Sequence, residues 1–419
     1  MELQLIFPIG VVLFVAIKYF LGKADENEKL LFGVYPQPGR WYWLKFCLFY
    51  SLLKLRSWGL LKRSGSAGYG SKSKVSLLDM ERSQPLSDHP FAIDAAYFNG
   101  YNEEGYFLGA GVQRRPNQEV ETLMFIRVPG LGILEWVNSP STAQKERVAG
   151  MYSTSGGLTL APVEAFKTWR VTLENANMQL REDRNRKFVV NFDLTWTADT
   201  PWIDFDTDLN PIALARSIAC EPWSREFFTR LQDAHQTHHE QFGVLRGRLD
   251  IGGYKTVDDW SMVSMRDHSY GKYRDWSHFH RYILQYLAVD DGTRIALHIV
   301  SMPGVLMSHL VSGFVVDTSG RKTNVVSIDK RLDQIGEDGI PPDEYSFNAY
   351  TADGQTLSVR ITKTVSMTYY CGKQWDAAIS PYLCKAQVNG VAGRGMCEFE
   401  YFNAQGAQMR RTHNELTTM

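Results

Sequence analysis

The stretch RDHSYGKYRDW, residues 266–276, gathers acidic, basic and aromatic side chains that can hold or transfer protons. On a β-strand, alternate residues point to opposite faces, so His268 and Tyr270 share one face while Asp267 and Ser269 share the other. A histidine and a tyrosine side by side could position and protonate a substrate. Asp267 could hold the imidazole charged, or act as the acid itself if burial raises its pKa. We therefore predict His268, Tyr270 and Asp267 as catalytic residues.

The same stretch also has a structural interpretation. Arg266 and Arg274 could form bidentate pairs with Asp267, Asp275 or Asp259 and so tie adjacent strands together. Both interpretations stay open at this point. We predict structural roles for Arg266, Arg274, Asp275, His239 and Glu240.

Histidines cluster in this part of the chain. Half of the ten histidines fall between residues 268 and 309, and His278 and His280 would share a face on a strand. We predict that the substrate is contacted by His278, His280, His298 and Tyr286.

A second group, His235, His238 and His239 in HQTHH, has the i, i+3, i+4 spacing that could present two imidazoles to zinc on a helix. The glutamate of an HExxH zinc site is missing, and His238 falls on the apolar stripe of the predicted helix. A core histidine is favoured, and no metal site is predicted.

Other classes of chemistry have little support in the sequence. There is no GxSxG nucleophile elbow and no P-loop, and GAGVQR at Gly109 lacks the third glycine of a dinucleotide fingerprint. We expect no cofactor. A net charge of −1 and a pI near 6.8 give no reason to expect nucleic acid as a partner.

The elements that must position these residues are mostly strands. Short runs with period-two alternation predict strands at 188–196, 244–251, 294–302, 309–317 and 357–365, and their spacing favours antiparallel sheets that close into barrels. One exception is 221–243, where Trp223, Phe227, Leu231, Ala234 and His238 recur at helical spacing. We expect a first β domain at 91–215, a connecting helix at 216–241 and a second β domain at 242–410.

The N-terminal part predicts contact with a membrane. Residues 5–22 are apolar apart from Lys18 and can span a bilayer, and Lys18 and Lys23 on the C-terminal side favour an uncleaved anchor with the bulk of the chain in the cytoplasm. We expect an anchor at 1–24.

Residues 41–63 mix aromatics and leucines with basic residues, as in a helix lying in the headgroup plane or, alternatively, a core helix. Residues 62–74 are Gly/Ser-rich and basic, which predicts a flexible linker. We expect residues 25–90 as a whole to form an amphipathic juxtamembrane segment and linker. An odd number of cysteines, five, and the absence of a glycosylation sequon favour cytosolic domains on a single-pass membrane protein, with the endoplasmic reticulum expected.

Two strings together resemble a known superfamily. HHEQFGVLRGRLDIGG followed by RDHSYGKYRDW is similar to the paired motifs of the carotenoid 1,2-hydratase, tocopherol cyclase and AttH-like superfamily, and GVAGRGMCEFEYFN resembles the C-terminal strand of its uncharacterised animal members. The resemblance implies two consecutive lipocalin-like β domains. His268 and Tyr270 match an His-x-Trp pair near the hydratase site, with Tyr270 in place of the tryptophan.

These observations lead to one expected function and one alternative. We expect a membrane-anchored enzyme that acts on a lipophilic, isoprenoid- or polyketide-like small molecule by cofactor-free acid catalysis: hydration, cyclisation or isomerisation. The alternative is a non-catalytic lipid carrier of lipocalin-like fold, since barrels that enclose apolar cavities often only bind.

Overall fold

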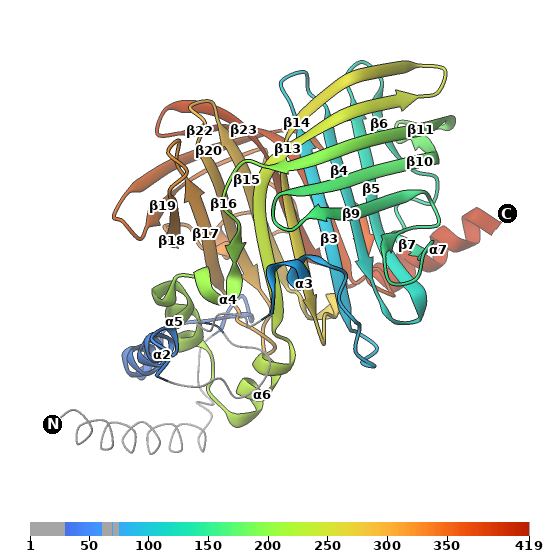
Figure 1. Cartoon of the computed structure of the whole chain (residues 1–419). Helices are drawn as coiled ribbons and strands as arrows, with labels where there is room; N and C mark the ends of the chain where they lie inside the picture. The colour runs from blue at the N-terminus through green and yellow to red at the C-terminus, as the bar shows by residue number, and fades with distance from the viewer. Residues whose placement is uncertain (1–29, 61–68, 70–74, 419) are drawn as a thin grey trace.

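A computed structural model of the chain describes residues 30–60, 69 and 75–418. The predicted membrane anchor at residues 1–24 and most of the predicted linker lie outside these residues. Within the part of the chain that the structure describes, no helix is long and apolar enough to cross a membrane. The fold is mainly β, as expected, with two large antiparallel sheets side by side and a group of helices at one end (Figure 1).

The first sheet closes into an eight-stranded antiparallel barrel, because β10 pairs with β11 and completes the ring. Its strands are β3 (Ile93–Tyr101), β4 (Phe107–Arg114), β5 (Glu119–Val128), β6 (Gly132–Trp136), β10 (Thr168–Leu180), β11 (Asp183–Ala198), β13 (Gln236–Ile251) and β14 (Lys255–Gly271). Short strands flank the ring: β7 (Ala143–Lys145), β8 (Tyr152–Ser153), β9 (Leu158–Glu164) and β12 (Ile203–Asp204). Apolar side chains such as Trp169, Trp196 and Trp260 fill its interior.

The second sheet has nine strands, and β20 pairs with β22, so that eight of them also form a ring. The ring consists of β15 (Arg281–Val289), β16 (Arg294–Ser301), β17 (Leu310–Val316), β18 (Lys322–Ile328), β19 (Glu344–Thr351), β20 (Thr356–Ser366), β22 (Ala377–Val388) and β23 (Val391–Phe402). The remaining strand, β21 (Tyr369–Cys371), pairs with β22. A separate core that includes Ile283, Phe347 and Phe399 fills this sheet.

The boundary between the two β units differs from the expected one. Residue 242 lies within β13, and β13 and β14 both pair into the first sheet. The first barrel therefore extends to Gly271, and the RDHSYG part of the motif belongs to it rather than to the second unit. The second unit begins at Arg281.

The helix predicted at 221–243 is also different. α6 covers only Arg225–Asp233, and the chain enters β13 at Gln236, so the HQTHH histidines lie at the start of a strand. Ser224 caps the helix by accepting a hydrogen bond from the Phe227 backbone N–H. His235, His238 and His239 therefore do not have the helical spacing that could present two imidazoles to zinc.

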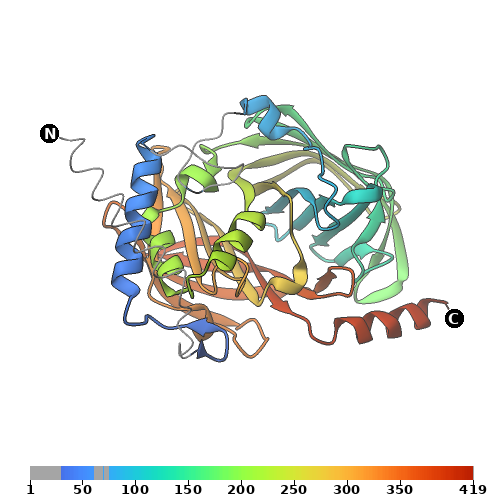
Figure 2. The same ribbon diagram turned by 90° about the horizontal axis from the view of Figure 1, so that it is seen from below.

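Helices cover one end of the molecule. They are α2 (Tyr42–Ser57), α4 (Phe205–Asp208), α5 (Pro211–Cys220) and α6, and Figure 2 shows α2 along the outer edge beside them. Phe49 and Leu53 of α2 pack with α5, α6 and Met307 in one apolar cluster. Three further elements lie outside this group: the β1–β2 pair (Leu30–Leu31 and Tyr35–Pro36), α3 (Leu77–Glu81) and the C-terminal α7 (Gly406–Thr418).

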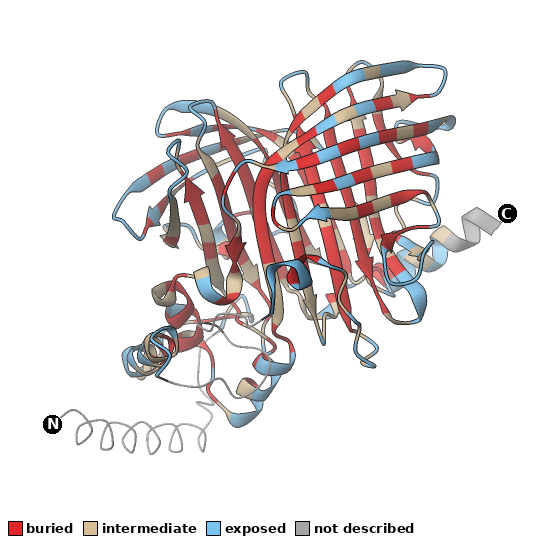
Figure 3. Cartoon of the chain, in the orientation of Figure 1, coloured by how far each residue is buried: buried red, intermediate tan, exposed pale blue. Residues whose placement is uncertain are grey.

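The two barrels share a third apolar core. Phe242 and Met265 of the first barrel pack with Tyr286, Phe314 and Met396 of the second. Figure 3 shows that the strands where the barrels meet are buried over most of their length. Outward-facing side chains of both barrels are thus held against each other, and the cavity described below lies among them.

Candidate functional site between the two barrels

Strand β14 divides its side chains between two environments. Arg266, His268 and Tyr270 point to the interior side of the first barrel, whereas Asp267 and Ser269 point outward into a cavity. The alternation predicted from the sequence is present, and it separates Asp267 from His268 and Tyr270.

The cavity, about 280 Å³, lies between the outer faces of the two barrels and beneath the helices. That volume is near the lower end of the range for small-molecule pockets, about 300–1,000 Å³. Most of its lining is apolar, with Leu123, Leu284, Val300, Leu306 and Leu310 among the contributors. Its polar groups come from facing strands of both barrels, so both barrels are needed to form the site.

Glu240 anchors the polar group at one end of the cavity. Its Oε1 accepts hydrogen bonds from Tyr286 Oη at 3.0 Å and lies 3.0 Å from His238 Nε2, and its Oε2 lies 3.2 Å from His298 Nε2. Burial acts to raise the pKa of Glu240, but His298 and His238 outweigh it and lower that pKa to about 2. Glu240 is therefore a carboxylate over the whole physiological pH range.

Asp267 lies directly opposite Glu240 in the register between β13 and β14. No hydrogen bond or ion pair joins its carboxyl group to another described residue. Burial is the largest influence on its pKa, the Glu240 carboxylate adds to it, and together they raise that pKa above its ordinary value in spite of His238 and Arg274. Neighbouring carboxyl groups in one cavity thus have pKa values displaced in opposite directions.

Tyrosines and the carboxyl group of Glu398 also line the cavity. Tyr97 lies opposite Asp267 on the other side, and its buried hydroxyl has no hydrogen-bond partner among the described residues. Glu398 Oε1 accepts a 2.7 Å hydrogen bond from Tyr282, and Tyr369 donates to its Oε2 at 3.3 Å. Burial raises the pKa of Glu398 to about 7. The cavity therefore holds groups able to give and to accept a proton at neutral pH.

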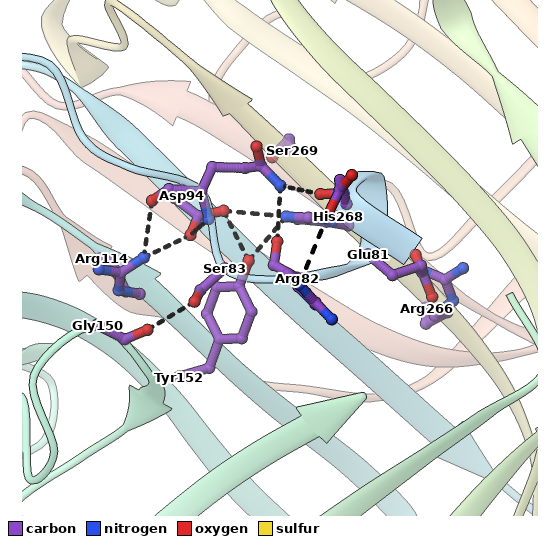
Figure 4. Close-up of polar contacts among 12 residues, drawn as sticks. Glu81, Arg82, Ser83, Asp94, Arg114, Gly150, Tyr152, Arg266, His268 and Ser269 are labelled. Carbon is purple, nitrogen blue, oxygen red and sulfur yellow. Dashed lines mark hydrogen bonds and ion pairs between the residues drawn. The ribbon is translucent and has the colours of Figure 1, made fainter. Parts of the chain in front are cut away.

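His268 belongs to a different polar cluster, inside the first barrel (Figure 4). Its Nε2 lies 2.9 Å from Asp94 Oδ1 and 2.8 Å from the hydroxyl of Tyr152, and Arg114 contacts Asp94 Oδ2 at 2.7 Å. All four side chains are buried. Asp94 contacts each of the other three side chains, which is the pattern of a structural network, whereas His268 Nδ1 has no hydrogen-bond partner among the described residues.

Arg266 is enclosed in the same barrel. It forms a 2.9 Å ion pair with Glu81 at the end of α3 and lies over the rings of Phe166, Trp169 and Trp196. Glu81 also accepts hydrogen bonds from the Trp169 indole and the Phe166 backbone. Arg266 therefore attaches α3 to the barrel, and it does not pair with the aspartates considered in the sequence.

Comparison with known proteins gives a family without an assigned function. The model of a "Family of unknown function (DUF8627)" matches residues 9–401. The chain belongs to this family. No curated protein matches it.

Two solved structures are similar to this DUF8627 chain. An AttH-like protein from Nitrosomonas europaea shares 13% identity with a TM-score of 0.48, over 75% of this chain and 94% of its own. Kievitone hydratase from Nectria haematococca shares 12% identity with a TM-score of 0.44, over 81% of this chain and 97% of its own.

The structure places the other predicted residues as follows. His298 and Tyr286 line the cavity, as does Glu240, which was predicted to be structural. His278 lies in a 3-10 turn rather than on a strand, bound to the Tyr273 hydroxyl, and His280 pairs with Glu337; neither is part of the cavity lining.

Three further predicted residues occupy structural positions. Arg274 borders the cavity and binds Gln236 and Ser269 instead of an aspartate. Asp275 caps the turn at Ser277. His239 is buried inside the first barrel, where burial and the nearby His268 lower its pKa to about 2 and keep the ring neutral.

Two tyrosines and one glutamate line the cavity but were not predicted from the sequence. Tyr97, Tyr282 and Glu398 lie on strands far apart in the sequence, and only the packing of one barrel on the other brings them to Asp267. One local signal was available, since Glu398 lies in the glycine-rich string at 390–403. Among the residues that the structure describes, no group of three or more His, Cys, Asp or Glu side chains is arranged to hold a metal ion.

Proposed function

We propose that this protein is an enzyme that moves protons on a lipophilic small molecule held between the two barrels. The reaction class is acid catalysis: hydration, cyclisation or isomerisation of an isoprenoid- or polyketide-like compound. Asp267 is the acid and Glu240 the base. The observation that carries the proposal is this pair of neighbouring carboxyl groups, one with a raised pKa and one with a pKa near 2, facing the same apolar cavity.

The acid step needs a protonated carboxyl group that is free to donate. No described residue forms a competing hydrogen bond with the Asp267 carboxyl group, and burial favours its neutral form. Transfer of its proton to a carbon–carbon double bond leaves a cationic substrate and an Asp267 carboxylate. The Glu240 carboxylate lies beside that cation and stabilises it in surroundings of low polarity.

The second step removes a proton. Glu240 accepts it either from a water molecule that attacks the cation, which gives hydration, or from a neighbouring C–H bond, which gives isomerisation or ring formation. The cross-strand position of the two residues, with Cβ atoms about 5 Å apart in such pairs, lets the proton return from Glu240 to Asp267 and completes the cycle. Proton transfer of this kind requires no redox cofactor.

The test is transfer of solvent hydrogen to carbon. The full chain is incubated with a lipophilic extract in D₂O, and products are searched by mass spectrometry for deuterium that does not wash out in H₂O. Wild type should label a defined compound, and Asp267→Asn should lower the rate by about 10²–10⁴-fold, the usual contribution of a general acid. Asp259→Asn, an exposed residue of the same strand, is the matched control and should keep full activity.

A non-catalytic carrier is the second candidate. It is favoured by the mostly apolar lining and by the hydrogen bonds that Glu240 and Glu398 already make with their neighbours. The same experiment separates the two functions. A compound that co-purifies with wild type and gains no deuterium would identify a carrier.

A further inference from the structure

Helix α2 is apolar on two faces, and the protein covers only one of them. Lys45, Phe49 and Leu53 point inward and are buried. On the opposite side, Trp43 is 69% exposed and Trp58 is 68% exposed. Large apolar side chains exposed together on one helix face mark a surface for interaction with another apolar environment.

The exposed side chains lie on one face of the helix. Leu44 and Trp58 are fourteen residues apart, close to four turns at about 3.6 residues per turn, and the exposed Cys47 and the half-buried Leu55 fall at compatible positions. We define the outer face of α2 as Trp43, Leu44, Cys47, Leu55 and Trp58. Tryptophan near both ends of such a face is typical of helices at a bilayer surface.

Charge favours a bilayer over a protein partner. Residues 41–63 contain five Lys or Arg and no Asp or Glu. Lys45 is buried and donates to the Glu221 carbonyl, and the other four basic residues leave the segment cationic, which attracts anionic headgroups. The same chain carries the apolar run at residues 5–22, about twenty residues before α2 in the sequence. Figure 2 shows that α2 lies along the outer edge of the molecule, with α5 and α6 to one side of it.

The inner face of α2 is connected to the cavity. Phe49 and Leu53 pack in the same cluster as Leu306, Leu310 and Tyr69, and these three residues also line the cavity. The wall of the cavity nearest the helices is therefore one apolar side chain layer away from α2.

We infer that the outer face of α2 docks on an anionic lipid bilayer and brings the helical end of the cavity to its surface. The docking stands independently of catalysis. Delivery of a lipophilic substrate from the bilayer through this end rests, in addition, on the proposed function.

The experiment measures how deeply α2 enters the bilayer. The full chain is bound to phosphatidylcholine–phosphatidylserine vesicles that contain brominated lipid, which quenches tryptophan emission at short range. This readout is independent of whether residues 5–22 also hold the protein on the vesicle. Wild type should be quenched, and a Trp43→Phe, Trp58→Phe variant should lose most of that quenching.

The control is Trp375→Phe, which replaces a buried tryptophan distant from α2 in sequence and should leave the quenching unchanged. Equal quenching of wild type and the double variant would overturn the inference. A wild type that is not quenched would also overturn it. If that wild type is a dimer that dissociates when Trp43 and Trp58 are replaced by serine, a second copy of the chain covers the outer face of α2 in place of a bilayer. Loss of catalysis in Asp267→Asn with quenching retained would leave docking intact and concern the reaction alone.

Discussion

At the scale of single residues, the cavity depends on how each carboxyl group is solvated and paired. Glu240 has three partners and stays ionised. Asp267 on the neighbouring strand has no hydrogen-bond or ion-pair partner in the part of the chain that the structure describes, and burial favours its neutral form. The sequence predicts that Asp267 and His268 point in opposite directions, because the period of a strand is two. It does not show which direction leads to a cavity, since that depends on the packing of the second barrel.

The carboxyl group of Glu398 predicts a pH-dependent stability. Its folded-state pKa of about 7 lies above the ordinary glutamate value of 4.5, so the folded protein holds this proton more tightly than the unfolded chain does. The resulting stabilisation is present below pH 4.5 and is lost as the pH rises through about 7. At about 1.4 kcal/mol per pKa unit, the loss is up to about 3 kcal/mol.

Urea unfolding at pH 5 and pH 8 measures this effect. Glu398→Gln should show a smaller loss of stability between the two pH values than wild type, because it lacks the titrating group. Glu344→Gln, an exposed glutamate of the second barrel, should follow wild type. If Glu398→Gln and wild type lose the same free energy of unfolding between pH 5 and pH 8, the pKa of Glu398 is not raised in the folded protein.

At the scale of elements, β14 and α6 show what local sequence can and cannot determine. The alternating strands at 188–196, 294–302, 309–317 and 357–365 are present because period-two patterns reflect a half-buried sheet surface. The helix predicted at 221–243 ends at Asp233, although the apolar spacing continues to His238. Pairing of β13 with β14, and with β12 at His239 and Glu240, determines the conformation of 236–243, and this long-range pairing has no signal in a single sequence window.

The attachment of α3 to the first barrel predicts that replacing Arg266 strongly lowers the free energy of unfolding. Arg266→Met would leave Glu81 buried without its ion-pair partner, and breaking a buried pair in this way costs about 3–5 kcal/mol. The double variant Arg266→Met, Glu81→Met removes both charges and should be destabilised less than the single variant. Chemical denaturation of the three proteins measures the difference, and a double variant less stable than Arg266→Met would contradict this role.

At the scale of the whole molecule, the shared core between the barrels determines where the site is. Each barrel has its own interior core, and the cavity residues come from the outer faces that the third core holds together. Two β units were predictable from the pattern of strands. Their boundary at residue 271, and the burial of polar outer faces against each other, depend on tertiary pairing that one sequence does not reveal.

Shared packing predicts that the two barrels unfold together. Phe242 contacts the rings of Tyr286 and Phe314 across the interface, so Phe242→Ala should lower the free energy of unfolding by about 3–5 kcal/mol and separate the transition into two. Phe192→Ala, inside the first barrel, should destabilise the protein without separating the transitions. Calorimetry resolves the two cases, and a single transition for Phe242→Ala would show that the barrels are coupled elsewhere.

The central claim is that Asp267 and Glu240 form an acid and base pair within one cavity. It is tested most directly by infrared titration of the carboxyl groups in the ligand-free full chain, with Asp267→Asn and Glu240→Gln used to assign the two signals. We predict that Asp267 takes up its proton at a higher pH than an ordinary aspartate, and that Glu240 remains ionised down to about pH 2. An Asp267 signal that titrates at or below the ordinary value of an aspartate, or a Glu240 that is protonated before Asp267, would contradict this prediction.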